Sequence, residues 1–551
     1  MFNLKPGLLP TTALAPVLVA ALAGLACGTA ATPTPTGKAA PTAPGTPAVV
    51  TAAPAPTATP KPKSIPRVGE RTLKVGLQSL NFPPDPALGG FLAVQSGIGE
   101  TLFKLGRDMK PEPWLATGAR RLDEKTWEVT LRQGVKFHNG ALMDAVAVEA
   151  SLERAIAKST RAKTLLDIAR IEVQDTSTVI ITTNKPSPIL PALLTELTAA
   201  VVNAAAAEAM GDAFKEGPVL TGPFKVERFQ QDKELLVVGH TEYWGPPPLL
   251  DRVIFTALPD PNSRLLALQS GDIDIAIRID PNSVPTVKGS PTLTVRSGPP
   301  IYLEFLYLNH RRDPWKDLRV RQAIAVAIDR EALSKGVTQG QGAPAIGPFP
   351  PAVLGCYQLR GHPFDPAKAR QLLAQAGYQD KDGDGFVEKE GETLAMTLLT
   401  YRFQPELSPM AEVIQASLKA IGIKVNVRTV ENPNPVLQQG DWDGGMYYVT
   451  MGVTGDAYLN LSQYFITGGS ANFGGYSSSR VDELTSQLGI ASDRQTREQL
   501  ACAASQAIID ELPVVPLIYP SFDFGVSRKV VGFDQPHPFA WYFIDSQIGK
   551  R

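Results

Sequence analysis

The acidic segment at 380–392, DKDGDGFVEKEGE, holds the side chains most typical of a metal site in this chain. Asp380, Asp382 and Asp384 alternate along the segment, and Glu388 follows them. Carboxylates at positions 1, 3, 5 and 9 of a loop with glycine at position 6 are the pattern that binds calcium. The twelfth position is glycine here, where calcium loops carry a bidentate glutamate. We therefore interpret the segment as a solvated turn and keep its four carboxylates as the alternative, a calcium site.

Enzyme motifs are missing from the sequence. It contains no G-x-S-x-G, no G-x-x-x-x-G-K-[ST], no H-E-x-x-H and no C-x-x-C. The histidines have no metal-ligand spacing. They are His138, His240, His310, His362 and His537. The missing motifs make an enzyme less expected, and an exported hydrolase stays as the remote alternative. We predict no catalytic residues, no cofactor and, apart from the acidic segment, no metal site.

The amino-acid composition excludes further classes of protein. The 551 residues carry 53 basic and 54 acidic side chains, a net charge of −1, which gives no basic surface for nucleic acid. Three cysteines are too few for a disulfide-rich scaffold or a cysteine-rich zinc module. The 43% hydrophobic content is enough for a large core divided among several domains.

The first residues read as a targeting segment. An apolar run at 8–26 ends in Gly-Leu-Ala directly before Cys27. Small residues before a cysteine are typical of a lipoprotein signal, so we predict a signal peptide at 1–26 and lipidation of Cys27. An uncleaved membrane anchor and ordinary signal cleavage are the alternatives, although two prolines break the run. All three place the remaining chain outside the cytoplasm.

Residues 27–66 are rich in threonine, proline and alanine and contain almost no large apolar side chains. Such a segment cannot bury enough surface to offset the entropy of ordering it. We predict a disordered, extended linker that separates a membrane anchor from a globular body.

From residue 67 onward the composition becomes globular, with strand and helix patterns mixed along the chain. Asp144 and Asp317 precede apolar helical periods, and Asp365-Pro366 is a strong helix start. Alternating or apolar runs predict strands. These runs lie at 71–77, 126–137, 178–184 and 249–258. The mixture predicts an α/β fold.

Several strings resemble the family 5 extracellular solute-binding proteins, which are the dipeptide, oligopeptide and nickel receptors of ABC importers. The resemblance runs from about residue 70 to 535. Its strings are LRQGVKFHNG (131–140), TGPFKVERF (221–229), EYWGPPPLLDRVIF (242–255), PDPNSRLLALQSGDIDIA (259–276), LRVRQAIAVAIDREAL (318–333), FDPAKARQLLAQAGY (364–378), NFGGYSSSRVDEL (472–484) and ELPVVPLIY (511–519).

The resemblance implies a two-lobed, periplasmic-binding-protein-like fold with the ligand in a cleft between the lobes. Lobe I would comprise 67–290, enlarged by an extra subdomain at about 95–220. Lobe II would follow at 291–518, and 519–551 would return to lobe I.

The resemblance also implies site residues. In peptide receptors of this family an aspartate in a late cleft loop pairs with the ligand's α-amino group, and here that role would fall to Asp456 in TMGVTGDAYLNL. A carboxylate facing an ammonium is physically reasonable, because neither charge is easily desolvated alone. Tyr448, Asn309 and Tyr519 lie in segments similar to cleft-lining strands and are candidate pocket walls.

The function implied is that of a monomeric receptor that captures a peptide and delivers it to the transmembrane subunits of an ABC permease. A nickel chelate or another small solute is the alternative ligand. Cys356, in a loop, and Cys502, in a helix, would both fall in lobe II. Export permits a disulfide between them, and a buried free thiol at Cys502 stays equally open.

Overall fold

We describe a computed structural model that covers residues 49–50, 71–401, 404, 406–539 and 542–551. The predicted signal peptide, Cys27 and most of the predicted linker lie outside these residues. One part of the linker is described, because strand β1 (Val49–Val50) pairs antiparallel with β5 (Ala116–Arg121).

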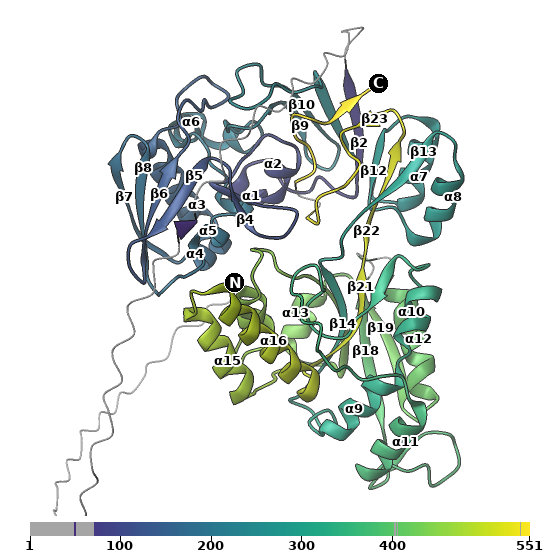
Figure 1. Cartoon of the computed structure of the whole chain (residues 1–551). Helices are drawn as coiled ribbons and strands as arrows, with labels where there is room; N and C mark the ends of the chain where they lie inside the picture. Colours follow the sequence, from purple (N-terminus) through teal and green to yellow (C-terminus); the bar gives the residue numbers. More distant parts are fainter. Residues whose placement is uncertain (1–48, 51–70, 402–403, 405, 540–541) are drawn as a thin grey trace, which may run out of the picture. The chain divides into compact units, whose positions relative to one another are not determined.

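A seven-stranded sheet forms the first half of lobe I, in the order β13-β22-β12-β2-β11-β10-β9 (Figure 1). Its centre, β12-β2-β11, is parallel, and the outer pairings are antiparallel. Side chains alternate between the two faces of a strand, and in β2 Leu73 and Val75 are fully buried on one face while Lys74 between them is exposed. The bounds are β2 (Thr72–Leu77), β9 (Phe224–Gln230), β10 (Glu234–Gly239), β11 (Arg252–Ala257), β12 (Ile275–Ile277), β13 (Leu293–Gly298) and β22 (Phe522–Ser527).

A five-stranded antiparallel sheet, ordered β1-β5-β6-β8-β7, forms the second part of lobe I. Apart from β1 it lies within the subdomain predicted at about 95–220. Helix α3 begins after Asp144, whose carboxylate accepts a hydrogen bond from the N–H of Ala147, and its buried face packs in the core of this sheet. The other bounds are β6 (Thr126–Leu131), β7 (Ile168–Asp175), β8 (Thr178–Thr183), α3 (Ala145–Lys158), α4 (Thr160–Leu166) and the short helix η1 (Leu197–Ala199).

Lobe II is built on a six-stranded sheet ordered β15-β21-β14-β20-β18-β19. The predicted helix starts at Asp317 and Asp365 are confirmed, because each carboxylate caps a helix. The strands are β14 (Tyr302–Leu308), β15 (Gly342–Pro344), β18 (Ala395–Tyr401), β19 (Lys424–Val430), β20 (Gly444–Thr450) and β21 (Val514–Pro520). The main helices are α9 (Leu318–Ala327), α11 (Pro366–Gln375), α12 (Leu407–Lys419), α14 (Tyr458–Tyr464), α15 (Ser479–Ile490) and α16 (Arg494–Glu511).

The chain passes between the two lobes where strand pairing changes sheet. β13 ends at Gly298 in the seven-stranded sheet, and β14 begins at Tyr302 in the six-stranded sheet. The return occurs at Ser521, between β21 and β22. The sequence analysis placed these transitions at 290/291 and 518/519, so the first change of sheet comes later in the chain than expected.

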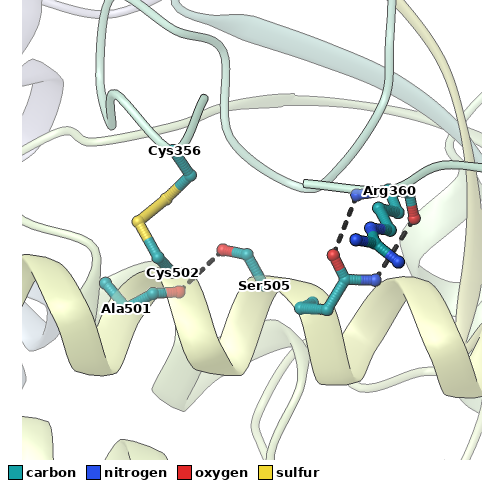
Figure 2. The surroundings of a disulfide bond; sticks show 6 residues. Cys356, Arg360, Ala501, Cys502 and Ser505 are labelled. Carbon is teal, nitrogen blue, oxygen red and sulfur yellow. Dashed lines mark hydrogen bonds between the residues drawn. A yellow bond between two sulfur atoms is a disulfide. The ribbon is translucent and has the colours of Figure 1, made fainter. Parts of the chain in front are cut away.

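A disulfide joins Cys356 to Cys502, with Cα atoms 5.5 Å apart (Figure 2). Of the two states that the sequence left open, the structure has the bridge. It ties the loop after β15 to the middle of α16. The backbone of Arg360 in the same loop exchanges hydrogen bonds with the side-chain amide of Gln506 one turn further along α16.

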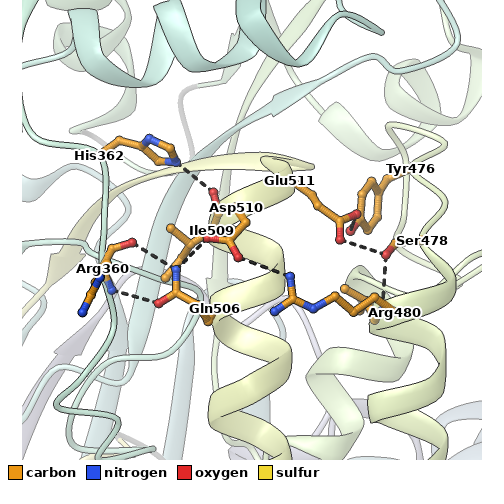
Figure 3. A network of polar contacts seen from close by, with 10 residues as sticks. Arg360, His362, Tyr476, Ser478, Arg480, Gln506, Ile509, Asp510 and Glu511 are labelled. Carbon is orange, nitrogen blue, oxygen red and sulfur yellow. Dashed lines mark hydrogen bonds and ion pairs between the residues drawn. The ribbon is translucent and has the colours of Figure 1, made fainter.

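Polar contacts continue along α16 toward its end (Figure 3). The His362 ring contacts the carbonyl oxygen of Ile509 at 2.9 Å. Glu511 accepts hydrogen bonds from the hydroxyls of Tyr476 and Ser478. These contacts and the disulfide attach α16 to two separate loops of lobe II.

Candidate functional site

A cavity of about 520 Å³ lies between the two lobes. This volume is within the range of roughly 300–1,000 Å³ that is usual for small-ligand sites. Its walls come from both lobes, and most of the side chains are apolar or aromatic. The lobe I residues are Phe82, Ala87, Leu88, Gly89, Gly90, Phe91, Leu105, Ser159, Arg161, Thr195, Glu196, Leu197, Thr198, Phe539 and Tyr542, and the lobe II residues are Tyr448, Val449, Thr450, Val453, Asn460, Gln463 and Tyr464.

The first wall follows the carboxyl end of β2. The chain there forms two short helices, α1 (Pro86–Gly89) and α2 (Phe91–Gln95). Gly90 joins them with φ of 46°, a backbone conformation that favours glycine. The sharp junction places Leu88, which is half exposed, and Phe91 on the cavity.

The opposite wall comes from β20 and from the chain that follows it to α14. Tyr448 and Thr450 lie on β20, Val453 lies in the connecting loop, and Tyr464 ends α14. Asn460 donates a hydrogen bond to the carbonyl oxygen of Thr450 and accepts one from the N–H of Gly452, and so holds the loop against the strand. The loop therefore presents an apolar side chain to the cavity.

One ion pair lies in the cavity wall. Arg161, at the start of α4, donates from Nε to Oε1 of Glu196 at 2.9 Å and from Nη2 to Oε2 at 3.0 Å. Glu196 Oε1 also accepts hydrogen bonds from the backbone N–H and the hydroxyl of Thr198. The Glu196 side chain is only 5% exposed, whereas that of Arg161 is 48% exposed. The carboxylate is thus neutralised beneath an accessible guanidinium.

A second charged cluster lies behind Tyr448 and joins the lobes. Arg278, which follows β12, donates to Glu406 at 2.8 Å and to the Tyr448 hydroxyl at 3.3 Å. Its guanidinium lies 5.0 Å from the centre of the Tyr448 ring, and Tyr302 stacks on that ring at 5.1 Å. Because Arg278 belongs to lobe I and the other residues belong to lobe II, the cluster orients Tyr448 from both sides of the cleft.

Glu304 on β14 completes this cluster and is fully buried. Desolvation raises the pKa of Glu304 well above its usual range, and the neighbouring Glu406 carboxylate raises it further. Desolvation also opposes the charged form of Glu406, but the positive charge of Arg278 and the hydrogen bonds to this carboxylate together outweigh it and lower the pKa of Glu406. The negative charge is therefore favoured on Glu406, next to Arg278, and disfavoured on Glu304.

Of the four predicted ligand contacts, Tyr448 lines the cavity. Asp456 does not line it. Its carboxylate makes two hydrogen bonds with Arg497 of α16, at 2.8 and 2.9 Å, and accepts another from the N–H of Tyr458. These contacts favour a structural role, because the carboxylate already has a cationic partner within the chain. The contact between Asp456 and a ligand's ammonium stays a prediction.

Asn309 and Tyr519 are buried in lobe II and are not among the residues that line this cavity, and their contact with a ligand stays a prediction. Asn309 is 0% exposed and donates from its side chain to the carbonyl oxygens of Gly440 and Trp442. The hydroxyl of Tyr519 donates to the carbonyl oxygen of Gly347 and accepts from its N–H. The polar groups of both side chains therefore bond to backbone groups of loops within lobe II.

The acidic segment forms an exposed turn. Oxygen atoms of Asp380, Asp382 and Asp384 lie within 4.8 Å of one another. Backbone N–H groups of the turn already occupy all three carboxylates, and Glu388 accepts from the N–H of Lys381 at 2.8 Å. The arrangement is that of aspartate-capped turns, and calcium binding stays a prediction.

Sequence reasoning missed most of the cavity wall. Residues 82–91 follow a parallel strand at its carboxyl end, where open α/β sheets usually bind ligands, and this signal was available. Arg161 and Glu196 are 35 residues apart and form no motif, so only the fold brings them together. Phe539 and Tyr542 come from the returning C-terminal segment.

Comparison with known proteins agrees with this architecture. Residues 110–475 match the family described as bacterial extracellular solute-binding proteins, family 5. The glutathione-binding protein GsiB of Salmonella paratyphi A is 30% identical over 456 residues, which are 80% of this chain and 87% of GsiB.

Solved structures with this fold include a nickel ABC transporter protein from Bacillus halodurans, with a TM-score of 0.73 and 30% identity over 87% of this chain and all of that one. NikA from Staphylococcus aureus in complex with Ni(L-His)2 has a TM-score of 0.75 and 25% identity over the same shares.

The chain belongs to family 5 of the bacterial extracellular solute-binding proteins of ABC importers. The two-lobed α/β fold predicted from the sequence is confirmed. Within the described ranges, no helix combines the length and the apolar character needed to span a bilayer.

Proposed function

We propose that this protein captures one peptide or peptide-like solute in the cavity between its lobes and delivers it to an ABC permease. The observation that carries the proposal is that both lobes line one cavity of about 520 Å³. A ligand held there contacts lobe I and lobe II at once, so it stabilises a closed arrangement of the lobes over an open one. A permease can then distinguish the loaded receptor from the empty one by the geometry of its lobes.

The relatives support a short peptide as the ligand, and they also support the alternative ligand, a nickel chelate. GsiB is named for glutathione, and NikA was solved with a nickel–histidine complex. The cavity is lined by Phe82, Phe91, Tyr448 and Tyr464, whose rings give a side chain or a chelate a broad apolar surface. The hydroxyls and amides among them provide hydrogen bonds that suit a peptide backbone, so the peptide leads and a nickel chelate is second.

Attachment to the membrane belongs to the same proposal. Cys27 would carry the lipid and become the first residue of the mature protein, and the segment after it would act as the spacer. The substitution Cys27→Ser should release the protein from the membrane fraction into the soluble extracytoplasmic fraction. A variant that stays membrane-bound at the wild-type level contradicts the lipid anchor.

The proposed function is tested by mass spectrometry of ligand that co-purifies under mild conditions, followed by calorimetry with that ligand. We expect one intact ligand per chain, and turnover of the bound peptide into fragments would instead support the hydrolase alternative. Leu88→Trp fills the cavity and should abolish binding. Leu266→Trp, at an exposed leucine outside the cavity wall, is the matched control and should bind as the wild type does. Equal binding by both variants refutes the site.

A further inference from the structure

The charges of the cavity wall cancel one another. Among the described residues that line the cavity, only Arg161 and Glu196 carry formal charge, and they bind each other through two hydrogen bonds. The loop after β20 contributes Val453, whereas the nearby carboxylate of Asp456 is held by Arg497. A ligand in the cavity therefore meets a wall with no net charge.

Arg161 retains N–H donors that do not bind Glu196. A guanidinium has five N–H donors, and two of them bind Glu196. Its side chain is 48% exposed in the wall, while Glu196 lies beneath it. A neutral carbonyl oxygen can accept hydrogen bonds from the remaining donors without bringing a second negative charge close to Glu196. A ligand carboxylate would instead share one guanidinium with Glu196, and the two like charges would repel each other.

Binding of a ligand ammonium group next to this ion pair is also unfavourable for electrostatic reasons. Glu196 is buried beneath Arg161 and its charge is already paired, so an ammonium would approach the guanidinium, a group of like charge. Much of the remaining cavity wall is apolar and includes Leu88, Phe91 and Val453. Burying an unpaired charge against such a surface is unfavourable, whereas an apolar side chain gains by leaving water.

We infer that the Arg161–Glu196 pair is a specificity determinant that selects a ligand whose central portion is uncharged, with a carbonyl oxygen bound by Arg161 and an apolar side chain against Leu88, Phe91 and Val453. The inference rests on the proposed function and deepens it. It names the substrate class as peptides or amides with an uncharged, apolar central residue. Glu196 acts as a positioning residue. Because its carboxylate already binds Arg161, a ligand carboxylate binds that guanidinium less well.

The test is calorimetry with five tripeptides Ala-X-Ala in which X is Leu, Phe, Gln, Glu or Lys, with glutathione and nickel–histidine as further probes. The wild type should bind the Leu and Phe peptides at least about tenfold more tightly than the Glu and Lys peptides. Glu196→Gln frees the guanidinium and should shrink the preference for Leu over Glu by about tenfold. Arg161→Gln should do the same for Leu over Lys.

The matched control is Asp510→Asn, which removes one carboxylate from the exposed Arg480–Asp510 pair between α15 and α16 and should leave every preference unchanged. If the wild type binds the Glu or Lys peptide as tightly as the Leu peptide, or if Glu196→Gln alters no preference, the inference fails while the proposed function stands. Tight binding of nickel–histidine that is insensitive to Glu196→Gln also overturns it. If no probe binds and no solute co-purifies, the proposed function itself fails.

Discussion

Two ion pairs with the same bidentate geometry lie close to the cleft and have different surroundings. In Arg161–Glu196 the arginine is 48% exposed on the cavity wall and the carboxylate is buried. In Arg497–Asp456 the arginine is 8% exposed and the carboxylate 17% exposed, behind the loop that follows β20. The first guanidinium is accessible to a ligand. The second also donates to the carbonyl oxygens of Leu488 and Ala491 and thereby links α15, α16 and the cleft loop.

The difference shows that an acidic residue in a cleft loop is not by itself a ligand contact. What decides its role is whether its partner within the chain leaves donors or acceptors facing the cavity. Arg161 retains such donors, whereas Asp456 has its carboxylate bound to Arg497 and to a backbone N–H. We therefore expect changes to the second pair to affect folding stability and changes to the first to affect ligand choice.

The largest effect is expected from Arg497→Met. Removal of the guanidinium leaves the Asp456 carboxylate without its cation and three chain segments without their link, so the free energy of unfolding should fall by about 3–5 kcal/mol. Chemical denaturation measures the loss. Asp456→Asn should lower stability too, but should reduce the affinity for free and amino-acetylated peptides equally. A selective loss for free peptides would show that Asp456 binds the ligand's ammonium after all.

The disulfide anchors the same helix, α16. Its removal should lower the free energy of unfolding by an amount similar to that of Arg497→Met. The cysteines are 146 residues apart, and closing so long a loop constrains the unfolded chain. The double substitution Cys356→Ser and Cys502→Ser should cost about 5 kcal/mol in the chain-entropy account, with ligand affinity unchanged in the folded protein. The unreduced wild type should show no free thiol at these two positions after unfolding. Two free thiols would refute the bridge in the native protein.

Glu100 is a third carboxyl group to compare with Glu196 and Asp456, and it is fully buried. Its hydrogen-bond donors are uncharged, whereas the other two carboxylates bind an arginine. The side chains of Thr221, Tyr243 and Trp244 donate to it. Desolvation outweighs these hydrogen bonds and raises the pKa of Glu100 from 4.5 to about 7. The folded protein thus keeps this proton at higher pH than the unfolded chain does.

The sign of the pH dependence follows from that shift. The stabilising contribution is fully present below pH 4.5 and is lost as the pH rises through about 7, a decrease of about 3 kcal/mol in the free energy of unfolding. Denaturant titrations of the wild type and Glu100→Gln across this range measure it. The variant should lack this component of the slope, and an identical slope in both proteins would contradict the assignment.

The smallest effect is expected at the acidic turn. Backbone N–H groups already bind Asp380, Asp382 and Asp384, so calcium or a chelator should change the melting temperature by no more than a surface substitution does, roughly 0.5 kcal/mol in stability. Asp382→Asn is the control. A clear upward shift with calcium that this variant abolishes would establish the calcium site.

Much of the fold could be predicted from the sequence, because its signals are local. The caps at Asp144, Asp317 and Asp365 each mark a helix start, and the order of the family strings implies two lobes. The cavity wall could not be predicted in the same way. Arg161 and Glu196 meet only through tertiary packing, and Asn309, which directly follows β14, is buried where its side chain donates to the carbonyl oxygen of Gly440, far along the chain.

The most direct test is a crystal structure of the protein with its co-purified ligand. The account predicts one ligand between the two lobes, in contact with Leu88 and Tyr448, with an uncharged carbonyl oxygen within hydrogen-bonding distance of Arg161 and with the Arg161–Glu196 and Arg497–Asp456 pairs both intact. A ligand bound outside this cavity, or a ligand carboxylate that displaces Glu196 from Arg161, would contradict it.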